Sequence, residues 1–586
     1  MNNLHQSITI IKKRFYTFDI PMIKTKYQVV LAIIILIVSI VLAYRNTFTV
    51  PFILDDTGNI LENSSIRSIW PPWQSFVIPQ DTGIVGRPVI NFSLAVNYAI
   101  SGYNVWSYHA VNLIIHILAA LTLFGVIRQT LLLMEKTGRN IGNPVFFSFV
   151  CALLWGLHPV QTQAVTYIIQ RCESLMALFF LLTFYSAIRG WQALNSRFWH
   201  LLAIMFFLLA VGSKEVAAVV PVLLLLYEWV FMGRNPMPAM KKSPFLYSGL
   251  ALGLLTVIVL LLKGNTLLSR TEHSDSTLLN YIITQCPVIL QYLRLSVWPI
   301  GLSIDYGWPI AAIKEAWPAI ILIISLIGLT SWALWRRNSI GFLGAWFFII
   351  LLPTSVVPLA DIAVAHRIYL PLAAVVTLFT GIVFNIFSLK LKHPEPPAFY
   401  KAVFTPAILI ALILCLGLTL GFMTYQRNYD YKSAIAIWSD TIEKRPLNYR
   451  GYHGLGIALS AQGRHEEGLE YMLKALKLNP DSAILYNDTG FVLLEMHRPT
   501  QALPYLLRAV QLRAHYPQAY NNIGGVFVQT GQLNQAIYYF SEALRQKPDY
   551  LTAYDNFLAV WAILKSKSSQ QNVGRSKLMK EQKNQH

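Results

Sequence analysis

The chain has 586 residues, of which 55% are hydrophobic and only 13% are charged, and its formal net charge is +19. This composition excludes an ordinary soluble enzyme and indicates a polytopic membrane protein. In a soluble protein the charge would suggest nucleic acid as a partner. In a membrane protein basic cytoplasmic loops account for it, so we predict no nucleic-acid binding.

The amino-terminal segment, residues 1–27, is basic and precedes the apolar run Val29 to Ala43, which predicts a first membrane helix. Tyr44-Arg45-Asn46 follows instead of a small-x-small cleavage site, so we expect a retained anchor rather than a removed signal. The flanking cations keep the amino terminus in the cytoplasm, which places Asp55 and Asp56 on the outer face.

Asp55 and Asp56 therefore emerge where the first membrane helix meets water. Two like charges at a low-dielectric boundary resist ionising together, so one pKa should rise, as suits a general base. The alternative is a solvated Asp pair that caps a helix, and the pair by itself does not decide between the two.

A long outer loop, residues 45–108, is rich in Trp, Pro and Asn. Because Trp commonly marks the lipid headgroup layer, parts of this loop should lie along the membrane surface and contact lipids. Within it, the run Pro88 to Ile100 has apolar residues at helical spacing and predicts an interfacial helix.

Ten further apolar runs predict membrane helices, which with the first makes eleven within residues 28–425. They lie at 109–133, 144–158, 172–188, 198–212, 215–232, 245–263, 316–335, 339–359, 366–388 and 402–424. The segment Leu278 to Ile300 is also apolar, but it contains Gln285, Gln291 and Arg294. Basic loops prefer the cytoplasm, so we interpret this segment as a surface helix, which puts Lys392 inside and His366 outside.

The carboxy-terminal part contains an internal repeat. Tyr452, Tyr486, Tyr520 and Tyr554 recur every 34 residues, and Gly456, Gly490 and Gly524 keep the same offset. This period is typical of tetratricopeptide repeats, so we predict a repeat domain at 430–564, with three full repeats over 449–550, on the outer face. Residues 565–586 are polar and basic and predict a disordered tail.

The four cysteines are scattered in or beside apolar runs, which favours small buried side chains over disulfides. No metal-ligand spacing appears, so no metal is assigned and no cofactor is predicted. The basic residues on the outer face need a different explanation. Together with nearby histidines they predict an anion site for the phosphate of a lipid-linked donor, although each alone could be a solvated charge or a structural ion pair. These residues are Arg87, His109, His158, Arg171, Lys214, His366, Arg367 and Tyr369.

Several motifs occur in a fixed order around these residues. They are Leu54-Asp55-Asp56, Gly86-Arg87-Pro88-Val89, His109-Ala-Val-Asn112, His158-Pro159-Val160-Gln161-Thr162-Gln163, Gly212-Ser213-Lys214-Glu215 and His366-Arg367-Ile368-Tyr369-Leu370-Pro371. With the repeats, they resemble the transmembrane and tetratricopeptide-repeat-containing (TMTC-type) O-mannosyltransferases of the GT-C class. The chain departs from that pattern in its short repeat array and in Gln163, where many relatives have an acidic residue.

The resemblance implies an all-α fold and inverting transfer of a sugar, typically mannose, from a polyprenyl-phosphate carrier to a Ser or Thr hydroxyl. The general base would be Asp55 or Asp56. The repeats would hold a protein acceptor, with Asn487, Asn521 and Asn522 as candidates to bind its backbone unless they only join neighbouring repeats. Two alternatives stay open, a non-catalytic scaffold and a lipid-linked oligosaccharide ligase or polymerase. Compact loops favour a bacterial cytoplasmic membrane with periplasmic repeats over an endoplasmic reticulum membrane with lumenal repeats.

Overall fold

The computed structural model describes residues 25–71, 73, 76–79, 82–136, 138, 142–263, 278–391 and 406–583. Within these ranges all regular structure is helical, which confirms the predicted all-α fold. The chain divides into two compact units. The first comprises residues 1–304 and 308–433, and the second comprises residues 305–307 and 434–586.

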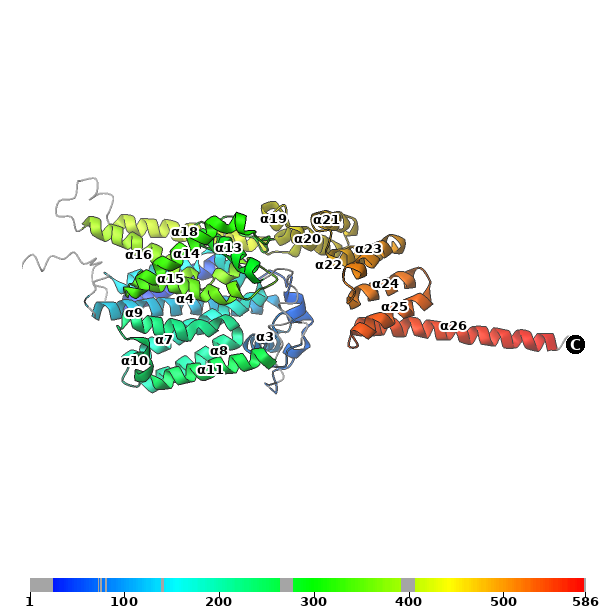
Figure 1. Ribbon diagram of the computed structural model, residues 1–586, viewed down its shortest axis with the longest axis horizontal. Coiled ribbons are helices and arrows are strands. Elements are labelled where there is room, and N and C mark those ends of the chain that lie inside the picture. Colours follow the sequence, from blue (N-terminus) through cyan, green and yellow to red (C-terminus); the bar gives the residue numbers. More distant parts are fainter. Residues whose placement is uncertain are drawn as a thin grey trace, which may run out of the picture. The chain divides into compact units, whose positions relative to one another are not determined.

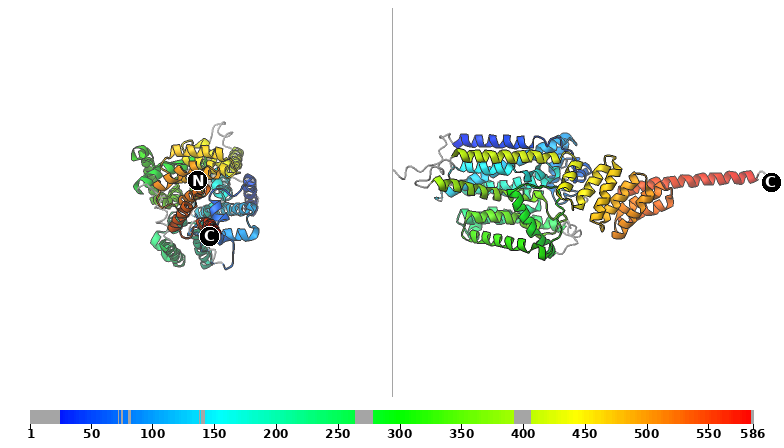
Figure 2. Two further views of the ribbon diagram at one scale, coloured as in Figure 1. Left: turned by 90° about the vertical axis from the view of Figure 1, so that its right-hand side faces the viewer. Right: turned by 90° about the horizontal axis from the view of Figure 1, so that it is seen from above.

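The first unit is built from long apolar helices that run roughly parallel to one another (Figure 1). Seven described spans are long and apolar enough to cross a membrane. They contain α2 (Thr25–Tyr44), α4 (Val105–Lys136), α7 (Arg171–Gln192), α8 (Ser196–Ser213), α14 (Ile313–Trp335), α15 (Ser339–Val356) and α18 (Pro406–Asp430). In the view from above, α2 and α18 lie side by side (Figure 2).

Two bent helix pairs could each form one further span, which makes up to nine among the described residues, and two apolar helices are shorter than a span. In the first pair, α5 (Pro144–Gly156) is followed by the helical segment Pro159–Val165, and the two are bent by 51°. In the second pair, the segment Glu215–Phe231, which contains α9 (Val220–Phe231), is followed by α10 (Pro236–Lys242) at 103°. The shorter apolar parts Pro244–Leu255 and Leu372–Phe387 lie in α11 (Pro244–Lys263) and α16 (Leu372–Leu391). Each of the eleven predicted runs therefore contains a helix or a bent pair, as expected of a multi-pass membrane protein.

Two predicted elements differ in detail. The run predicted at 366–388 begins as a helix only at Leu372, because Ala365–Ile368 forms a 3-10 turn, η7, ahead of it. Leu278–Val297 forms one helix, α13, that is long enough to cross a membrane but is not apolar enough to count as a span. Its buried residues, among them Tyr281, Val288 and Tyr292, recur at helical spacing on one face, as an amphipathic helix requires.

Contacts within the first unit agree with the predicted topology. Arg337, after α14, donates hydrogen bonds to the carbonyl oxygen of Gly233 (3.2 Å) and to Oδ1 of Asn235 (2.8 Å), and all three were predicted to be cytoplasmic. At the other end, the His366 amide donates to Oε1 of Gln163 (3.0 Å), and both were predicted to face outward. Loops assigned to the same side thus contact each other.

This topology predicts the labelling of single cysteines introduced into a cysteine-free chain. Asp361→Cys, at an exposed outer position, should react with a membrane-impermeant thiol reagent in intact cells or sealed vesicles of outward orientation. Arg336→Cys, also exposed, should react only after the membrane is permeabilised. The reverse pattern would contradict the eleven-helix arrangement. Lys392, which also bears on the topology, lies outside the described residues.

The second unit contains the predicted repeats. After α19 (Ala434–Lys444) come three helix pairs, followed by α26 (Leu551–Lys583). The pairs are α20 (Tyr449–Ser460) with α21 (His465–Leu478), α22 (Ala483–Glu495) with α23 (Pro499–Leu512), and α24 (Pro517–Gln529) with α25 (Leu533–Gln546). A Cβ on Gly490 would lie 2.5 Å from Leu506, and one on Gly524 would lie 2.5 Å from Phe540, so glycine lets the paired helices approach closely.

Two sequence predictions were wrong. The tail predicted to be disordered from residue 565 is helical as far as Lys583, because α26 continues through it (Figure 1). This segment is rich in Lys, Gln and Ser and contains no proline, and its one glycine, Gly574, disfavours a helix far less than a proline would. Not every cysteine is buried either, since Cys415 on α18 is exposed and Cys286 is intermediate, whereas Cys151 and Cys172 are buried.

Candidate functional site

Asp56 is a buried residue on the turn that follows the first membrane helix, and its side chain holds that turn together. Its carboxylate is fully buried and accepts hydrogen bonds from the backbone amides of Ile53 (3.1 Å) and Ile169 (2.8 Å). Between Ile53 and Asp56, Leu54 has a φ of +51°, a conformation that is unfavourable for a branched side chain. These two hydrogen bonds therefore hold the strained turn in its conformation and connect it to the segment before α7.

Asp55, on the same turn, is presented outward. Its side chain is exposed, its amide donates to the Tyr167 hydroxyl (2.9 Å), and its carbonyl accepts from Asn59 Nδ2 (2.6 Å). The backbone of Asp55 is thus fixed from both sides, and its exposed side chain also hydrogen-bonds the buried Tyr167 hydroxyl. The two acids have different environments, which the sequence alone did not distinguish.

Burial raises the pKa of the Asp56 carboxyl to about 8, although two backbone amides and the charge of Arg171 favour its ionised form. The folded protein thus keeps a proton that the unfolded chain releases above its ordinary pKa of 3.8. The resulting stabilisation is fully present below that value and is lost as the pH rises toward about 8.

We therefore expect the thermal unfolding midpoint of the solubilised protein to decrease as the pH is raised from 5 to 8. The midpoint of an Asp56→Asn variant, which cannot ionise at this position, should decrease less over the same range. Asp55→Asn is the matched control, because its side chain is exposed and its profile should run parallel to that of the wild type. Parallel profiles for wild type and Asp56→Asn would contradict the buried, proton-holding role of Asp56.

The first turn of α7 connects the turn at residues 53–56 to a cluster of charged side chains. Arg171 is fully buried, and its guanidinium donates to Asn112 Oδ1 (2.6 Å) and to the carbonyl oxygens of Tyr108 (3.1 Å) and Ser93 (3.3 Å). These bonds tie α7 to α3 (Pro88–Ser101) and α4. Arg171 therefore holds the site together, and its burial keeps it from a direct contact with a bound phosphate unless the site rearranges.

Two ion pairs lie beside this turn. Lys214 Nζ is 2.7 Å from Glu173 Oε1, and both side chains are almost fully buried. Arg87 is 3.3 Å from Glu215 Oε1, and these side chains are 16% and 32% exposed. Lys214 therefore forms a structural ion pair, with Glu173 rather than with the adjacent Glu215, because the chain turns at residue 214 and directs the two side chains to different partners.

Gly212 explains why α8 and α3 can bring these pairs together. A Cβ at this position would lie 2.7 Å from the Val89 side chain, so only glycine permits the close approach of the two helices. Burial alone would lower the pKa of Arg87, but the Glu215 carboxylate beside it holds the pKa above its usual value. Arg87 is therefore always charged, and it is more accessible than Lys214.

His366 and Arg367 add to this cluster from the turn before α16. Burial, and then the charges of Lys214, Arg367 and Arg87, hold the pKa of His366 well below its ordinary value. Its ring is thus neutral, and its Nδ1 is buried with no hydrogen-bond partner among the described residues. Three cations thus lie near this neutral imidazole, and two of them, Lys214 and Arg87, are paired with glutamates.

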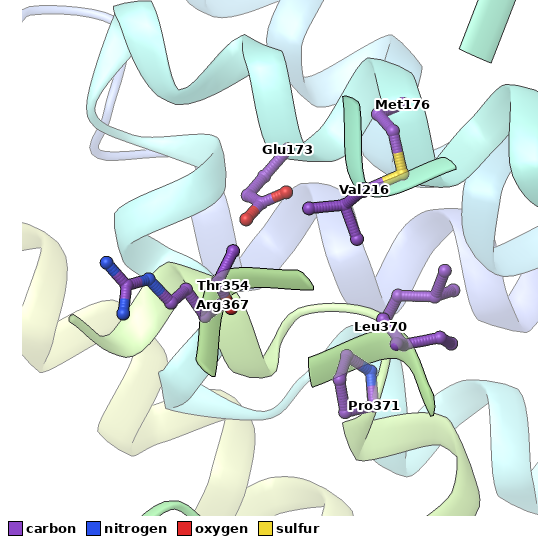
Figure 3. Close-up of a pocket in the computed structure, with 8 residues that line it drawn as sticks. Glu173, Met176, Val216, Thr354, Arg367, Leu370 and Pro371 are labelled. Atoms are coloured by element: carbon purple, nitrogen blue, oxygen red, sulfur yellow. The ribbon is translucent and has the colours of Figure 1, made fainter. Parts of the chain in front are cut away.

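Behind these residues lies a cavity of about 10 Å³, lined by Glu173, Val216, Thr354 and Arg367 among others. Figure 3 shows the Glu173 carboxylate directed toward this space, whereas the Arg367 guanidinium points away from it. That guanidinium donates to the carbonyl oxygens of Ile362 (3.0 Å) and Asp361. The cavity holds no more than a single water molecule, so it is too small for a sugar or a lipid phosphate.

Three predicted site residues point into the protein. His109 Nε2 donates to the carbonyl oxygen of Val50 (2.8 Å), and His158 Nδ1 accepts from the amide of Val160 (3.3 Å) and caps a 3-10 turn. The Tyr369 hydroxyl lies 2.7 Å from Nδ1 of His116 and is buried. These side chains position loops, and the more accessible candidates are Asp55, Arg87 and His366.

The sequence reasoning missed Glu173 and Tyr167. Glu173 had a usable signal, because an acidic residue inside an otherwise apolar helix is rare and generally has a cationic partner. Tyr167 had none, since its contact with the Asp55 amide depends on the path of the loop. Among the described residues, no group of three or more His, Cys, Asp or Glu side chains could hold a metal ion.

In the repeat unit, the three predicted Asn residues form a ladder between neighbouring repeats. Asn522 Nδ2 donates to Asn487 Oδ1 (2.9 Å), and Asn556 Nδ2 donates to Asn521 Oδ1 (2.9 Å). Asn487 and Asn521 are 5% and 8% exposed. Of the two roles considered for these residues, the structure thus shows the joining of repeats.

Comparisons with known proteins agree with these observations. Tetratricopeptide-repeat models match residues 449–482 and 489–550. The chain is 26% identical to the human (Homo sapiens) protein O-mannosyl-transferase TMTC3 over 486 residues, which cover 76% of this chain and 51% of that protein. It is 24% identical to protein O-mannosyl-transferase F38B6.6 of Caenorhabditis elegans, covering 78% and 64%, and 24% identical to mouse (Mus musculus) TMTC4, covering 73% and 64%.

The chain thus spans about half the length of the first of these curated relatives. The similarity nevertheless extends over about three quarters of the chain, more than the repeats alone occupy. The resemblance indicated by the motifs is therefore confirmed: over about three quarters of its length this chain is similar to TMTC-type proteins, and its carboxy-terminal part contains tetratricopeptide repeats.

Proposed function

We propose that the chain is a membrane glycosyltransferase that moves a sugar, mannose in the first instance, from a polyprenyl-phosphate carrier to a Ser or Thr hydroxyl. The observation that carries this proposal is the turn at residues 53–56. There a buried acid, Asp56, holds a strained backbone so that a second acid, Asp55, faces solvent at the outer end of α2. The names of the relatives supply the substrate class.

In this proposal the acceptor hydroxyl approaches the anomeric carbon of the donor from the side of Asp55. Asp55 takes the hydroxyl proton as the new carbon–oxygen bond forms. The bond between the anomeric carbon and the phosphate oxygen breaks, and its electron pair leaves with the lipid phosphate. A single displacement of this kind inverts the anomeric configuration, and general-base help contributes about 10²–10⁴-fold to the rate.

Arg87 is the proposed contact for the departing phosphate. Its ion pair with Glu215 is long, at 3.3 Å, and partly exposed, so an incoming phosphate can replace that carboxylate. His366 would donate or accept a hydrogen bond beside it, while Lys214 and Arg367 add positive charge from behind. Arg171, His109, His158 and Tyr369 would keep these loops in place through the backbone contacts described above.

The test is to incubate the purified full-length protein in detergent or nanodiscs with labelled polyprenyl-phosphate sugars and a Ser/Thr-containing protein. Alkali-labile label on the acceptor, strongest with the mannose donor, is the expected result. A scaffold would neither transfer nor hydrolyse any donor. An oligosaccharide ligase would use only a preassembled lipid-linked oligosaccharide.

The repeats would bind the protein acceptor on the face of the membrane that carries Asp55 and so raise its local concentration. Deleting residues 449–564 should then raise the KM for a protein acceptor strongly and leave donor hydrolysis by water almost unchanged. Comparing both activities in one preparation checks this expectation. If both fell together, the repeats would instead be needed for the folding of the membrane unit.

A further inference from the structure

The second unit contains a groove of about 530 Å³ that the membrane chemistry does not use. Its lining includes Asn487 and Asp488 on α22, Arg513 in the turn after α23, Gln518 in the first turn of α24, and Lys547 directly after α25. The volume falls within the range of ligand-binding pockets, and the lining is mostly polar.

Two cations in this groove occupy equivalent positions in successive repeats. Arg513 and Lys547 are 34 residues apart, and each follows the last residue of the second helix of its repeat. Their backbones match, with φ and ψ of −141° and 96° at Arg513 and of −136° and 92° at Lys547. The same position in the first repeat is Asn479, at −140° and 84°, so the charge is specific to the second and third repeats.

Aromatic rings, rather than carboxylates, hold these cations in place. The Arg513 guanidinium lies 5.3 Å from the ring centre of Tyr516, and Lys547 Nζ lies 6.0 Å from that of Tyr550. Neither cation forms a salt bridge with any residue in the part of the chain that the structure describes. Both charges are therefore available to a ligand.

The one carboxylate among the lining residues is already engaged. Asp488 Oδ2 lies 2.8 Å from Nε2 of His453, and its Oδ1 accepts from Asn487 Nδ2 (2.8 Å). His515 also lines the groove. The groove therefore offers two unpaired cations and the side-chain amide of Gln518 to whatever enters it.

We propose that this groove binds an acidic segment of an extended polypeptide, with one carboxylate at Arg513 and a second at Lys547. An extended chain fits because the two cations are one repeat apart, and the side-chain amide of Gln518 can hydrogen-bond a peptide backbone. This inference rests on the proposal that the repeats hold the protein acceptor. It adds that the acceptors are selected by their acidic residues.

The experiment measures the affinity of the full-length solubilised protein for a fluorescent peptide in which Glu alternates with Ser and Thr. A second peptide has Gln in place of each Glu. The charge-removing variant is Arg513→Gln/Lys547→Gln, and the charge-preserving variant is Arg513→Lys/Lys547→Arg. The matched control is Arg464→Gln/Lys474→Gln, which removes the same charges at exposed positions where each cation pairs with a glutamate, Glu467 or Glu470.

We expect the charge-removing variant to bind the acidic peptide about tenfold more weakly than the wild type, since two partly exposed ion pairs are lost. The control and the charge-preserving variant should bind it as the wild type does, and added salt should weaken binding. Equal affinity of the wild type for the two peptides would overturn the inference. So would an equal loss in the control, or binding of anionic-lipid vesicles but not of peptide.

Peptide binding and sugar transfer are measured separately in this design, so the two proposals can fail independently. Transfer to neutral and acidic acceptors with the same KM would overturn the acidic selection and leave the glycosyltransferase assignment intact. Charge-dependent peptide binding in a protein that transfers no sugar would contradict the assignment and support the groove.

Discussion

Asp55→Asn should lower sugar transfer by about 10²–10⁴-fold, because the variant loses its general base while its fold is unchanged. The side chain is exposed, the backbone contacts of this residue with Tyr167 and Asn59 are kept, and the amide can still hydrogen-bond the Tyr167 hydroxyl that the Asp55 side chain contacts. The purified variant should therefore have the thermal unfolding midpoint of the wild type. Transfer rates at saturating donor, together with unfolding curves, measure the two properties.

Asp56→Asn is the companion variant, and it should affect the protein differently. The amide has a single acceptor oxygen, so one of the two backbone amides, that of Ile53 or of Ile169, loses its partner. An unsatisfied buried donor costs about 1–3 kcal/mol of unfolding free energy. Near-normal turnover in Asp55→Asn, with a complete loss of transfer in a well-folded Asp56→Asn, would show that the roles are reversed.

The second large effect is expected at the buried ion pair. Lys214→Met leaves the Glu173 carboxylate buried without its cation, and breaking a buried pair from one side costs about 3–5 kcal/mol. We expect poor yield and a strongly lowered unfolding midpoint. Arg464→Met, which breaks the exposed pair with Glu467, is the matched control and should leave the midpoint unchanged.

The double variant Lys214→Met/Glu173→Gln removes both charges and should recover most of the stability. Its transfer activity then separates two roles of Lys214. If Lys214 only balances Glu173, activity returns together with stability. If its charge also attracts the donor phosphate, the folded double variant has a raised KM for the donor. A double variant as unstable as Lys214→Met would contradict the pairing.

The sequence was sufficient to predict helices and repeats because both depend on periodic patterns. The spacing of Tyr452, Tyr486 and Tyr520 located all three helix pairs, and the basic loops predicted which ends meet. The roles of individual polar residues were harder to predict. Lys214 pairs with Glu173, 41 residues away, rather than with its neighbour, because a side chain's direction depends on how the chain turns in three dimensions.

The same reason explains the histidines and the Asn ladder. His158 seemed available to a ligand, but its ring accepts the hydrogen bond of Val160 two residues later. Asn487 and Asn522 contact each other across 35 residues, which only the stacking of repeats reveals. The acidic pair was recognised from sequence, yet only the structure shows that Asp56 is buried and binds two backbone amides, whereas the Asp55 side chain is exposed.

The anomeric configuration of the product tests the central claim most directly, namely single displacement with Asp55 as the base. A short Ser/Thr acceptor would be glycosylated by the wild-type protein with a donor of known configuration, and the product examined by NMR spectroscopy. The account predicts inversion at the anomeric carbon. Retention would require a second displacement through a covalent sugar–enzyme intermediate, and it would contradict the assignment of Asp55 as a general base.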